Sequence, residues 1–540
     1  MITKWGVKNF KSILEADLDL APLTIFTGVN SSGKSSFLHS IAMLKQSVIH
    51  YPEHDRLDKD EVDDEYDEDE VHEADELYDG DEVDDEGDNE TLYGSFNLNG
   101  DVKLGFMDSV LCYKAADYPD NDIGINFTVI LEDNNHVNVK VECGYQEVVN
   151  LKRILLIKFL CLEYNNGENT IYIKSQVISE DIFEHKITFK SKGIEEKYTA
   201  ISSYDFITDG SDQPKPDFNN FNFLPDAIIY SKNSSFEQLN KILRKLNKYF
   251  LLNIKYLQPL REEPNWVIDK IQDKNDKQDV DAKGKNTIAF LKSKLEDNYE
   301  VENYISPKVI DSSSYSHKSK EYLRNALKDW LIHFGVCTDY EIENAYFDLN
   351  RDGLDIDWEL TPFYDPDDLN DPSFTRKEGI SLYLTIDGKK FTLKQLGTGV
   401  GQIFPVLVMC LTAPIGSTII IQEQEQGLHP KMQSRLADFF IAMALSGRQC
   451  IIETHSEYII EQLRYRIIMM SDLKPEPLHK LTKLYFVTKR NGISHFKDIE
   501  INEYARLDEW PENFFDISHK ISNKIMKEVI KKWETAKQND

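Results

Sequence analysis

A glycine-rich loop between a predicted strand and a predicted helix constrains the fold of this chain more than any other feature. Residues 23–28 read LTIFTG, an apolar run that predicts a buried strand, and a helical pattern begins at Lys34. The residues between them, GVNSSGKS at 28–35, match the phosphate-binding pattern GxxxxGK[ST]. Glycines remove the Cβ atoms that would block phosphates, so backbone N–H groups can converge on them at a helix N-terminus. The loop therefore predicts a nucleotide-binding α/β unit.

The residue types in this loop predict individual roles. Lys34 is expected to reach the β- and γ-phosphates of the nucleotide, and the Ser35 hydroxyl is expected to bind Mg²⁺. The predicted nucleotide-binding residues are Gly28, Asn30, Ser31, Ser32, Gly33, Lys34, Ser35 and Ser36.

Six segments of different composition follow one another along the 540 residues. They are 1–53 with the loop, 54–92 rich in acids, 93–234 rich in β patterns, 235–345 helical, 346–470 with alternating strands and helices, and 471–540 with an amphipathic helix. Strands that alternate with helices predict a parallel sheet. The expected fold class is α/β, with a largely parallel sheet, an antiparallel β lobe and an inserted helical lobe.

The negative charge is concentrated in one segment. The chain has a net charge of −32, and residues 54–90 contain 22 Asp or Glu and two Lys or Arg. Mutual repulsion predicts a disordered, solvated loop. The alternative is a DNA-mimicking or partner-docking segment that covers a basic surface.

Two further features bear on the compartment. The six cysteines are scattered without a CxxC pair, which favours a reducing environment. The uncharged stretch from 395 to 422 is long enough to cross a bilayer, but Pro405, Pro414 and Gly416 divide it. We therefore expect a cytoplasmic protein without a membrane span.

Several motifs resemble those of ABC-type ATPases of the SMC and RecF branch. KNFKS and the loop resemble their N-terminus, LKQLGTGVGQIFPVLV (393–408) their signature motif, TIIIQEQEQGLHP (418–430) their Walker B segment, and IIETHS (451–456) their switch-histidine segment. KYLQPLREEP (255–264) and INEYARLDEWPENFFD (501–516) extend the resemblance to AAA-type ATPases found beside anti-phage effectors. The PtuA-type ATPases of Septu and retron-associated systems are examples, as is the ATPase half of OLD nucleases.

The resemblance implies an ABC-type ATPase head that binds ATP and Mg²⁺. It also implies a head-to-tail homodimer, in which ATP is sandwiched between one P-loop and the partner's signature. Gly397, Thr398 and Gly399 would bind nucleotide as signature residues, and His455 would be catalytic. Gly397 stands where the family has serine, and Thr398 is a candidate substitute for the missing hydroxyl.

The Walker B segment departs from the family pattern. Counting back from LHP at 428–430 places Gln422 at the magnesium-side carboxylate position and Glu423 at the catalytic position. A neutral amide can act on Mg²⁺ through a water but brings no charge. A one-residue slip, permitted by a bulge, would instead assign Glu423 to the metal and Glu425 to catalysis. We therefore expect ATP to be bound well and hydrolysed slowly.

The resemblance also suggests partners. No HNH-like, PD-(D/E)xK or Ser/His/Asp constellation is recognisable, so we expect no nuclease site in this chain. The family instead implies a sensor or scaffold that controls a separate HNH nuclease (PtuB-like), with a reverse transcriptase and RNA–DNA in retron-associated forms. A RecF-like DNA-repair ATPase and a non-hydrolysing scaffold stay open as alternatives. Nucleic-acid contact also stays open, because basic side chains gather at 241–248 and 520–532.

Overall fold

The computed structural model describes part of the chain and divides it into two compact units. The described residues are 1–47, 122–131, 135–148, 152–179, 182–191, 194–203, 234–259, 261, 279–312, 318–350, 374–471, 476–508 and 526. The first unit takes in 1–40, 111–139 and 252–540, and the second takes in 41–110 and 140–251. The acidic segment and almost all of the tail after 508 lie outside the described residues, so the expectations for them stay predictions.

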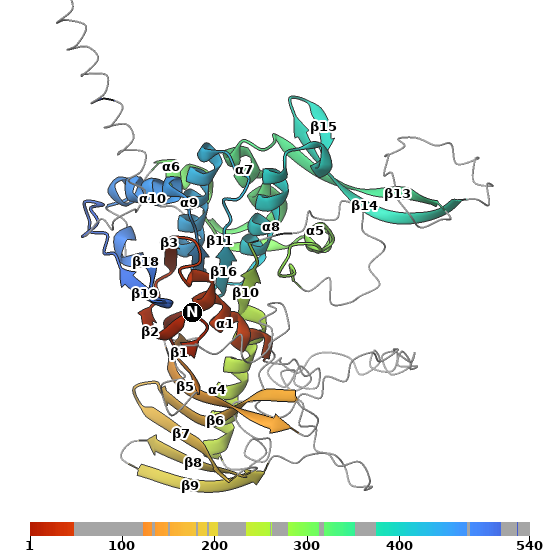
Figure 1. The fold of residues 1–540 in the computed structure, drawn as a ribbon. Helices are drawn as coiled ribbons and strands as arrows, with labels where there is room; N and C mark the ends of the chain where they lie inside the picture. Colours follow the sequence, from red (N-terminus) through yellow and green to blue (C-terminus); the bar gives the residue numbers. More distant parts are fainter. Residues whose placement is uncertain are drawn as a thin grey trace, which may run out of the picture. The chain divides into compact units, whose positions relative to one another are not determined.

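A six-stranded sheet is the centre of the first unit (Figure 1). Its strands, in spatial order, are β10 (Ile254–Leu257), β16 (Thr418–Gln422), β17 (Gln449–Glu453), β3 (Leu23–Gly28), β18 (Thr482–Arg490) and β19 (Ile493–Asp498). Every neighbouring pair is parallel except β18 and β19. The predicted α/β fold class is thus confirmed. β10 lies within the range for which the sequence indicated helices.

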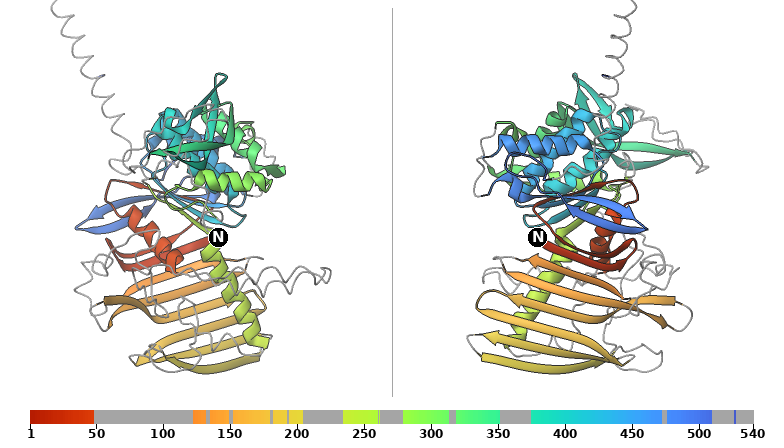
Figure 2. Two further views of the ribbon diagram at one scale, coloured as in Figure 1. Left: turned by 90° about the vertical axis from the view of Figure 1, so that its right-hand side faces the viewer. Right: turned by 60° about the vertical axis from the view of Figure 1, so that its left-hand side comes forward.

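The two faces of this sheet are buried in different surroundings, because successive strand side chains point to opposite sides. On one face, Ile25, Ile421 and Ile452 belong to the main hydrophobic core. On the other face, the Phe26 ring lies 5.1 Å from Phe37, in the part of α1 that belongs to this unit. Figure 2 shows the later helices on one side of the sheet and the start of α1 on the other.

Seven helices are described in or entering the first unit. They are α1 (Lys34–Ser47), α5 (Thr287–Glu296), α6 (Pro307–Ser312), α7 (Leu323–Phe334), α8 (Thr398–Thr412), α9 (Pro430–Leu445) and α10 (Glu457–Met469). Two short 3₁₀ turns, Leu393–Gln395 and Leu478–Leu481, precede α8 and β18. None of the described helices is both long and apolar enough to cross a membrane. The uncharged stretch considered above instead forms α8 and β16.

Three antiparallel groups complete the first unit. They are β2-β1-β4 (Ile13–Asp19, Ile2–Phe10, Ile123–Ile130), β11-β12 (Glu300–Tyr304, Lys318–Tyr322) and β13-β14-β15 (Asp339–Asn350, Phe374–Ile386, Lys389–Thr392). The Trp5 ring of β1 stacks on Phe127 at 5.1 Å, and its Nε1–H donates to Ser40 Oγ at 2.8 Å. This buried tryptophan ties the first group to α1.

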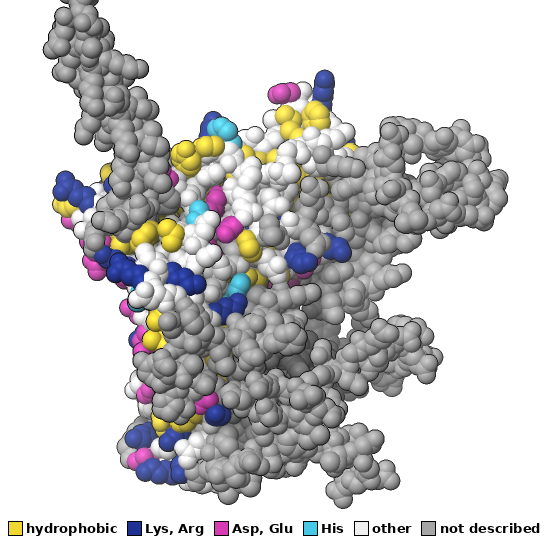
Figure 3. Space-filling model, in the orientation of Figure 1, with side chains coloured by type: hydrophobic (Ala, Val, Ile, Leu, Met, Phe, Trp, Pro, Cys, Tyr) yellow, Lys and Arg dark blue, Asp and Glu magenta, His cyan; other side chains and the backbone are white. Residues whose placement is uncertain are grey.

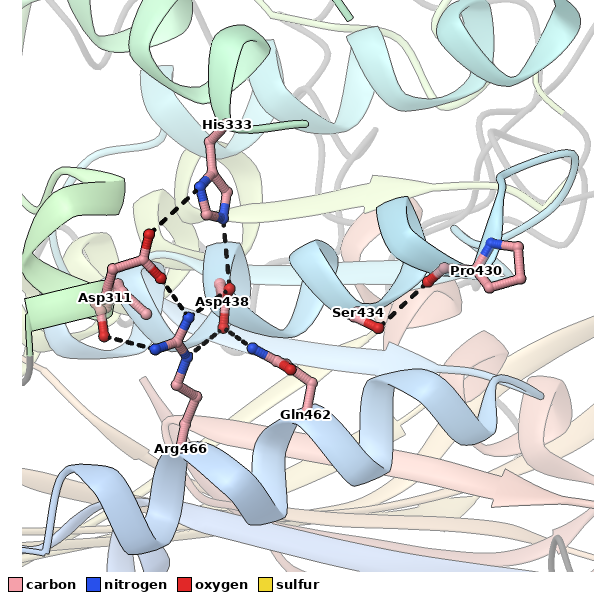
Figure 4. Close-up of polar contacts among 8 residues, drawn as sticks. Asp311, His333, Pro430, Ser434, Asp438, Gln462 and Arg466 are labelled. Atoms are coloured by element: carbon pink, nitrogen blue, oxygen red, sulfur yellow. Dashed lines mark hydrogen bonds and ion pairs between the residues drawn. The ribbon is translucent and has the colours of Figure 1, made fainter. Parts of the chain in front are cut away.

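A buried ion cluster joins four helices of the first unit (Figure 4). Arg466 of α10 donates to both carboxylate oxygens of Asp438 on α9, at 2.7 and 2.9 Å. Arg466 also donates to Asp311 of α6 at 2.6 Å, and Gln462 donates to Asp438 at 2.9 Å. His333 of α7 lies 3.4 Å from Asp438. These contacts therefore link α6, α7, α9 and α10 to one another.

The second unit is mainly antiparallel β structure, which agrees with the pattern of its sequence. Strand β5 (His136–Val148) runs into it, followed by β6 (Lys152–Asn165), β7 (Asn169–Ser179), β8 (Ile182–Ser191), β9 (Ile194–Ser203) and helix α4 (Ser234–Lys248). The strands β6 to β9 pair antiparallel in chain order. Helix α4 buries Leu239, Ile242 and Leu246. Lys241, Arg244 and Lys248 on the same helix are exposed. A short π-helical turn, Tyr249–Asn253, leads from α4 to β10.

Candidate functional site

The predicted phosphate-binding loop connects β3 to α1, as the sequence pattern requires. Gly28 and Gly33 have φ angles of 138° and 108°, values that side chains rarely tolerate. A Cβ at Gly28 would lie 2.2 Å from the Val487 carbonyl oxygen of β18, so no other residue fits there without a shift of the strand. The loop conformation therefore depends on the glycines that the pattern contains.

Two polar side chains of the loop are buried in a way that suits an anionic ligand. The Lys34 ammonium donates to the Gly28 and Val29 carbonyl oxygens of its own loop, at 3.3 and 3.0 Å. Burial lowers the pKa of Lys34, and the neighbouring carboxylates, Glu453 first, oppose that shift. The buried Ser32 hydroxyl has no hydrogen-bond partner among the described residues. A phosphate would supply acceptors for both groups.

Glu453 is the carboxylate that contacts the loop. It ends β17, and its Oε1 accepts from Ser35 Oγ at 2.9 Å and lies 3.8 Å from Lys34 Nζ. Its Oε2 accepts from Gln422 Nε2 at 2.9 Å. Burial raises the pKa of Glu453, while Lys34, Ser35 and Gln422 favour the charged form. The sequence motifs led us to His455 of this segment but not to Glu453.

Gln422 and Glu423 have different surroundings although they are adjacent. Gln422 is buried and is the last residue of β16, whereas Glu423 is partly exposed and has a φ of 46°, outside the extended region. The chain therefore turns directly after Gln422. The Glu423 Oε1 lies 3.9 Å from His455 Nε2, and the Gln426 side chain donates to its Oε2. Glu423 and His455 thus face one another beside the loop.

Glu425 contacts the backbone of the switch-histidine segment. Its Oε1 accepts from the His455 backbone N–H at 2.5 Å. Burial raises the pKa of Glu425. The neighbouring Gln424 is buried, and neither polar atom of its side chain has a partner among the described residues. These contacts place Glu425 where it holds the position of His455.

The predicted signature residues begin α8. Gly397 is the residue before the helix, and both Gly397 and Thr398 are exposed. A Cβ at Gly399 would lie 2.6 Å from the Gly427 carbonyl oxygen in the loop after β16. The helix start therefore packs closely against the Walker B segment of the same chain.

Basic side chains are also present on the described surface of the first unit. Figure 3 shows Lys and Arg side chains gathered where Figure 1 places β18 and β19. Lys489, Arg490 and Lys497 of this hairpin are exposed. This basic surface was not predicted, because the hairpin mixes its basic residues with apolar ones along the chain, unlike the segments 241–248 and 520–532.

Comparison with known proteins identifies the family to which this geometry belongs. The family described as AAA ATPase domain matches residues 1–460, and one described as protein of unknown function (DUF3696) matches residues 479–520. No curated protein matches the chain.

Similar solved structures include an Smc head bound to the C-terminal winged-helix domain of ScpA, with 9% identity and a TM-score of 0.32 over 93% of this chain and 98% of that chain. The SMC head domain from Thermotoga maritima has 9% identity and a TM-score of 0.32, over 93% of this chain and 99% of that chain. An Smc head from Pyrococcus furiosus with an extended coiled coil, bound to the C-terminal domain of ScpA, has 10% identity and a TM-score of 0.31. The match covers 98% of this chain and 99% of that chain.

Proposed function

Because the chain belongs to the AAA ATPase domain family, we propose that it binds ATP with Mg²⁺ and hydrolyses it slowly. One observation carries this proposal. A buried ammonium, a hydroxyl and a carboxylate, from Lys34, Ser35 and Glu453, meet under the loop at the carboxyl ends of parallel strands. Ligands of open α/β sheets bind at that edge.

The loop residues have distinct tasks in ATP binding. Backbone N–H groups at the start of α1 face the phosphates, and the helix dipole favours negative charge there. Lys34 exchanges its loop carbonyl partners for phosphate oxygens, and the buried Ser32 hydroxyl gains a partner. Mg²⁺, when bound, neutralises phosphate charge, and Ser35 with a nearby acid would hold it.

Turnover would depend on Glu423 and His455. Glu423 is partly exposed beside the loop, where a general base can accept a proton from the attacking water. His455 lies within reach of Glu423, and Glu425 holds the His455 backbone in place. A neutral Gln422 and a signature without its serine make slow turnover the expected outcome.

We further propose that the ATP-bound chain forms a head-to-tail homodimer and controls a separate effector nuclease in anti-phage defence. The support for the dimer is the start of α8, where Gly397 and Thr398 are exposed, because a helix N-terminus suits a phosphate such as that of the partner's ATP. The support for the defence role is the resemblance of the motifs to Septu-type ATPases. An HNH nuclease is the expected partner, with a retron's reverse transcriptase and RNA–DNA in retron-associated forms.

The test combines ATP binding with single-turnover hydrolysis. Lys34→Ala is expected to weaken ATP binding at least tenfold, because the phosphates lose their buried cation. Glu423→Gln is expected to keep binding and to slow hydrolysis about 100- to 10,000-fold, or about 3–5 kcal/mol of barrier. Glu503→Gln, an exposed acid outside the site, is the matched control. Turnover that is brisk and unaffected by Glu423→Gln would exclude this assignment of the base.

The same binding and hydrolysis assays distinguish the proposed function from two alternatives. The exposed basic residues of the β18–β19 hairpin favour a RecF-like ATPase, for which DNA would stimulate turnover. The neutral Gln422 favours a scaffold that binds ATP without turnover. Turnover that DNA does not change supports the sensor proposal against both.

A further inference from the structure

The end of β16 and the end of β17 are level with one another beside the phosphate-binding loop. The two strands are parallel neighbours, and their register pairs Gln422 with Glu453. At such paired positions in adjacent strands, the side chains point to the same face of the sheet. The negative charge that Gln422 of β16 lacks is therefore present on β17, at the paired residue Glu453.

The contacts of Glu453 are those expected of a metal-side carboxylate. One oxygen accepts from Ser35, the loop hydroxyl that would bind Mg²⁺, at 2.9 Å. Lys34 lies 3.8 Å from the same oxygen. The Glu453 side chain is only 3% exposed, so water contributes little to the stabilisation of its charge and the neighbouring Ser35 and Lys34 contribute most.

Gln422 is held so that its amide nitrogen faces this carboxylate. The Tyr256 hydroxyl donates to Gln422 Oε1 at 2.6 Å, which leaves Nε2 to donate to Glu453. The Arg261 guanidinium donates to the Gln422 backbone carbonyl at 2.8 Å. Both partners come from the KYLQPLREEP motif, to which sequence reasoning had assigned no role. A carboxylate at 422 would instead put two negative charges in contact, which costs free energy in a buried site.

We propose that Glu453 of β17 supplies the Mg²⁺-side carboxylate of this ATPase and that Gln422 is the neutral residue that positions it. The inference rests on the proposed ATP binding. Two further observations point to a ligand here: the unpartnered, buried Ser32 hydroxyl, and ligand atoms of Glu423, Glu453 and His455 that lie within 4.8 Å of one another. Mg²⁺ prefers oxygen, so Ser35 and Glu453 match it better than His455 does.

The experiment measures metal binding and not turnover. Full-length protein is mixed with Mn²⁺ and a non-hydrolysable ATP analogue, and bound Mn²⁺ is titrated by electron paramagnetic resonance. Glu453→Gln is expected to weaken Mn²⁺ binding at least tenfold, and Glu503→Gln, the exposed acid outside the site, is the matched control that should leave it unchanged. The double variant Gln422→Glu/Glu453→Gln moves the charge back across the strand pair and is expected to recover most of the lost affinity.

Each outcome decides the proposal. Mn²⁺ affinity of Glu453→Gln within twofold of wild type overturns it, as does a loss in Glu423→Gln but not in Glu453→Gln. If Glu453→Gln does not fold, Glu453→Asp keeps the charge but shortens the side chain. A severalfold loss of Mn²⁺ affinity in Glu453→Asp then supports the proposal, and no loss overturns it. Wild-type protein that binds no ATP at all refutes the proposed function itself, whereas wild-type binding with an unchanged Glu453→Gln refutes only this inference.

Discussion

Replacing Asp438 with asparagine is expected to destabilise the first unit by about 3 kcal/mol, at the lower end of the range for breaking a buried ion pair. Asp438 and Arg466 are 2% and 7% exposed, and two hydrogen bonds join them. The substitution keeps the shape of the side chain but leaves the guanidinium without its buried counter-charge. The remaining charged partner, Asp311, is 56% exposed and compensates for part of that loss.

The same pair predicts a pH dependence. Burial by itself would raise the pKa of Asp438, but hydrogen bonds from His333 and Arg466 outweigh it and hold the pKa below its usual value. A carboxyl whose pKa is lowered on folding stabilises the protein above the pKa of the unfolded chain, which is about 4. That stabilisation is lost as the pH falls through the lower pKa of the folded state. The difference in stability between wild type and Asp438→Asn should therefore shrink below about pH 4.

Urea unfolding at pH 7 and at lower pH measures both effects through the midpoint and the slope. Glu461→Gln on α10, the helix of Arg466, is the control, because Glu461 forms a surface pair with Arg464 at 2.7 Å, with side chains 47% and 28% exposed. Such a pair contributes at most about 1 kcal/mol. The reasoning would be refuted if Asp438→Asn lost no more stability than Glu461→Gln, or if its deficit persisted unchanged in acid.

Three other changes follow from single contacts. Gly28→Ala puts a Cβ 2.2 Å from a strand carbonyl, and it should weaken ATP binding at least tenfold in calorimetry while the circular dichroism spectrum stays native. Ser40→Ala leaves the buried Trp5 N–H without its acceptor, which should cost about 1–3 kcal/mol in urea unfolding; a change below about 0.5 kcal/mol would contradict this. Tyr256→Phe frees the Gln422 amide, and about tenfold weaker Mg²⁺-dependent ATP binding is expected, with binding in EDTA unchanged.

The phosphate-binding loop and the fold class were accessible from the sequence because their signals are local. Eight consecutive residues specify the loop, and the alternation of strands and helices predicts a parallel sheet. The turn after Gln422 was only one of two registers that the sequence allowed. In the structure, Gln422 ends the strand and Glu423 lies beside His455. The roles assigned to these residues stay predictions.

The carboxylate that contacts Ser35 depended on tertiary structure. Ser35 and Glu453 are 418 positions apart, Gln422 and Glu453 are 31 apart, and Tyr256 and Gln422 are 166 apart. The sequence shows that Glu453 ends a predicted strand, but no local pattern predicts which strand lies beside β16. Strand order is set by packing over the whole sheet, and only that order brings Glu453 level with Gln422 under the loop. A local motif of eight residues predicts a nucleotide site, whereas the strand order of the sheet sets which acid lies beside that motif.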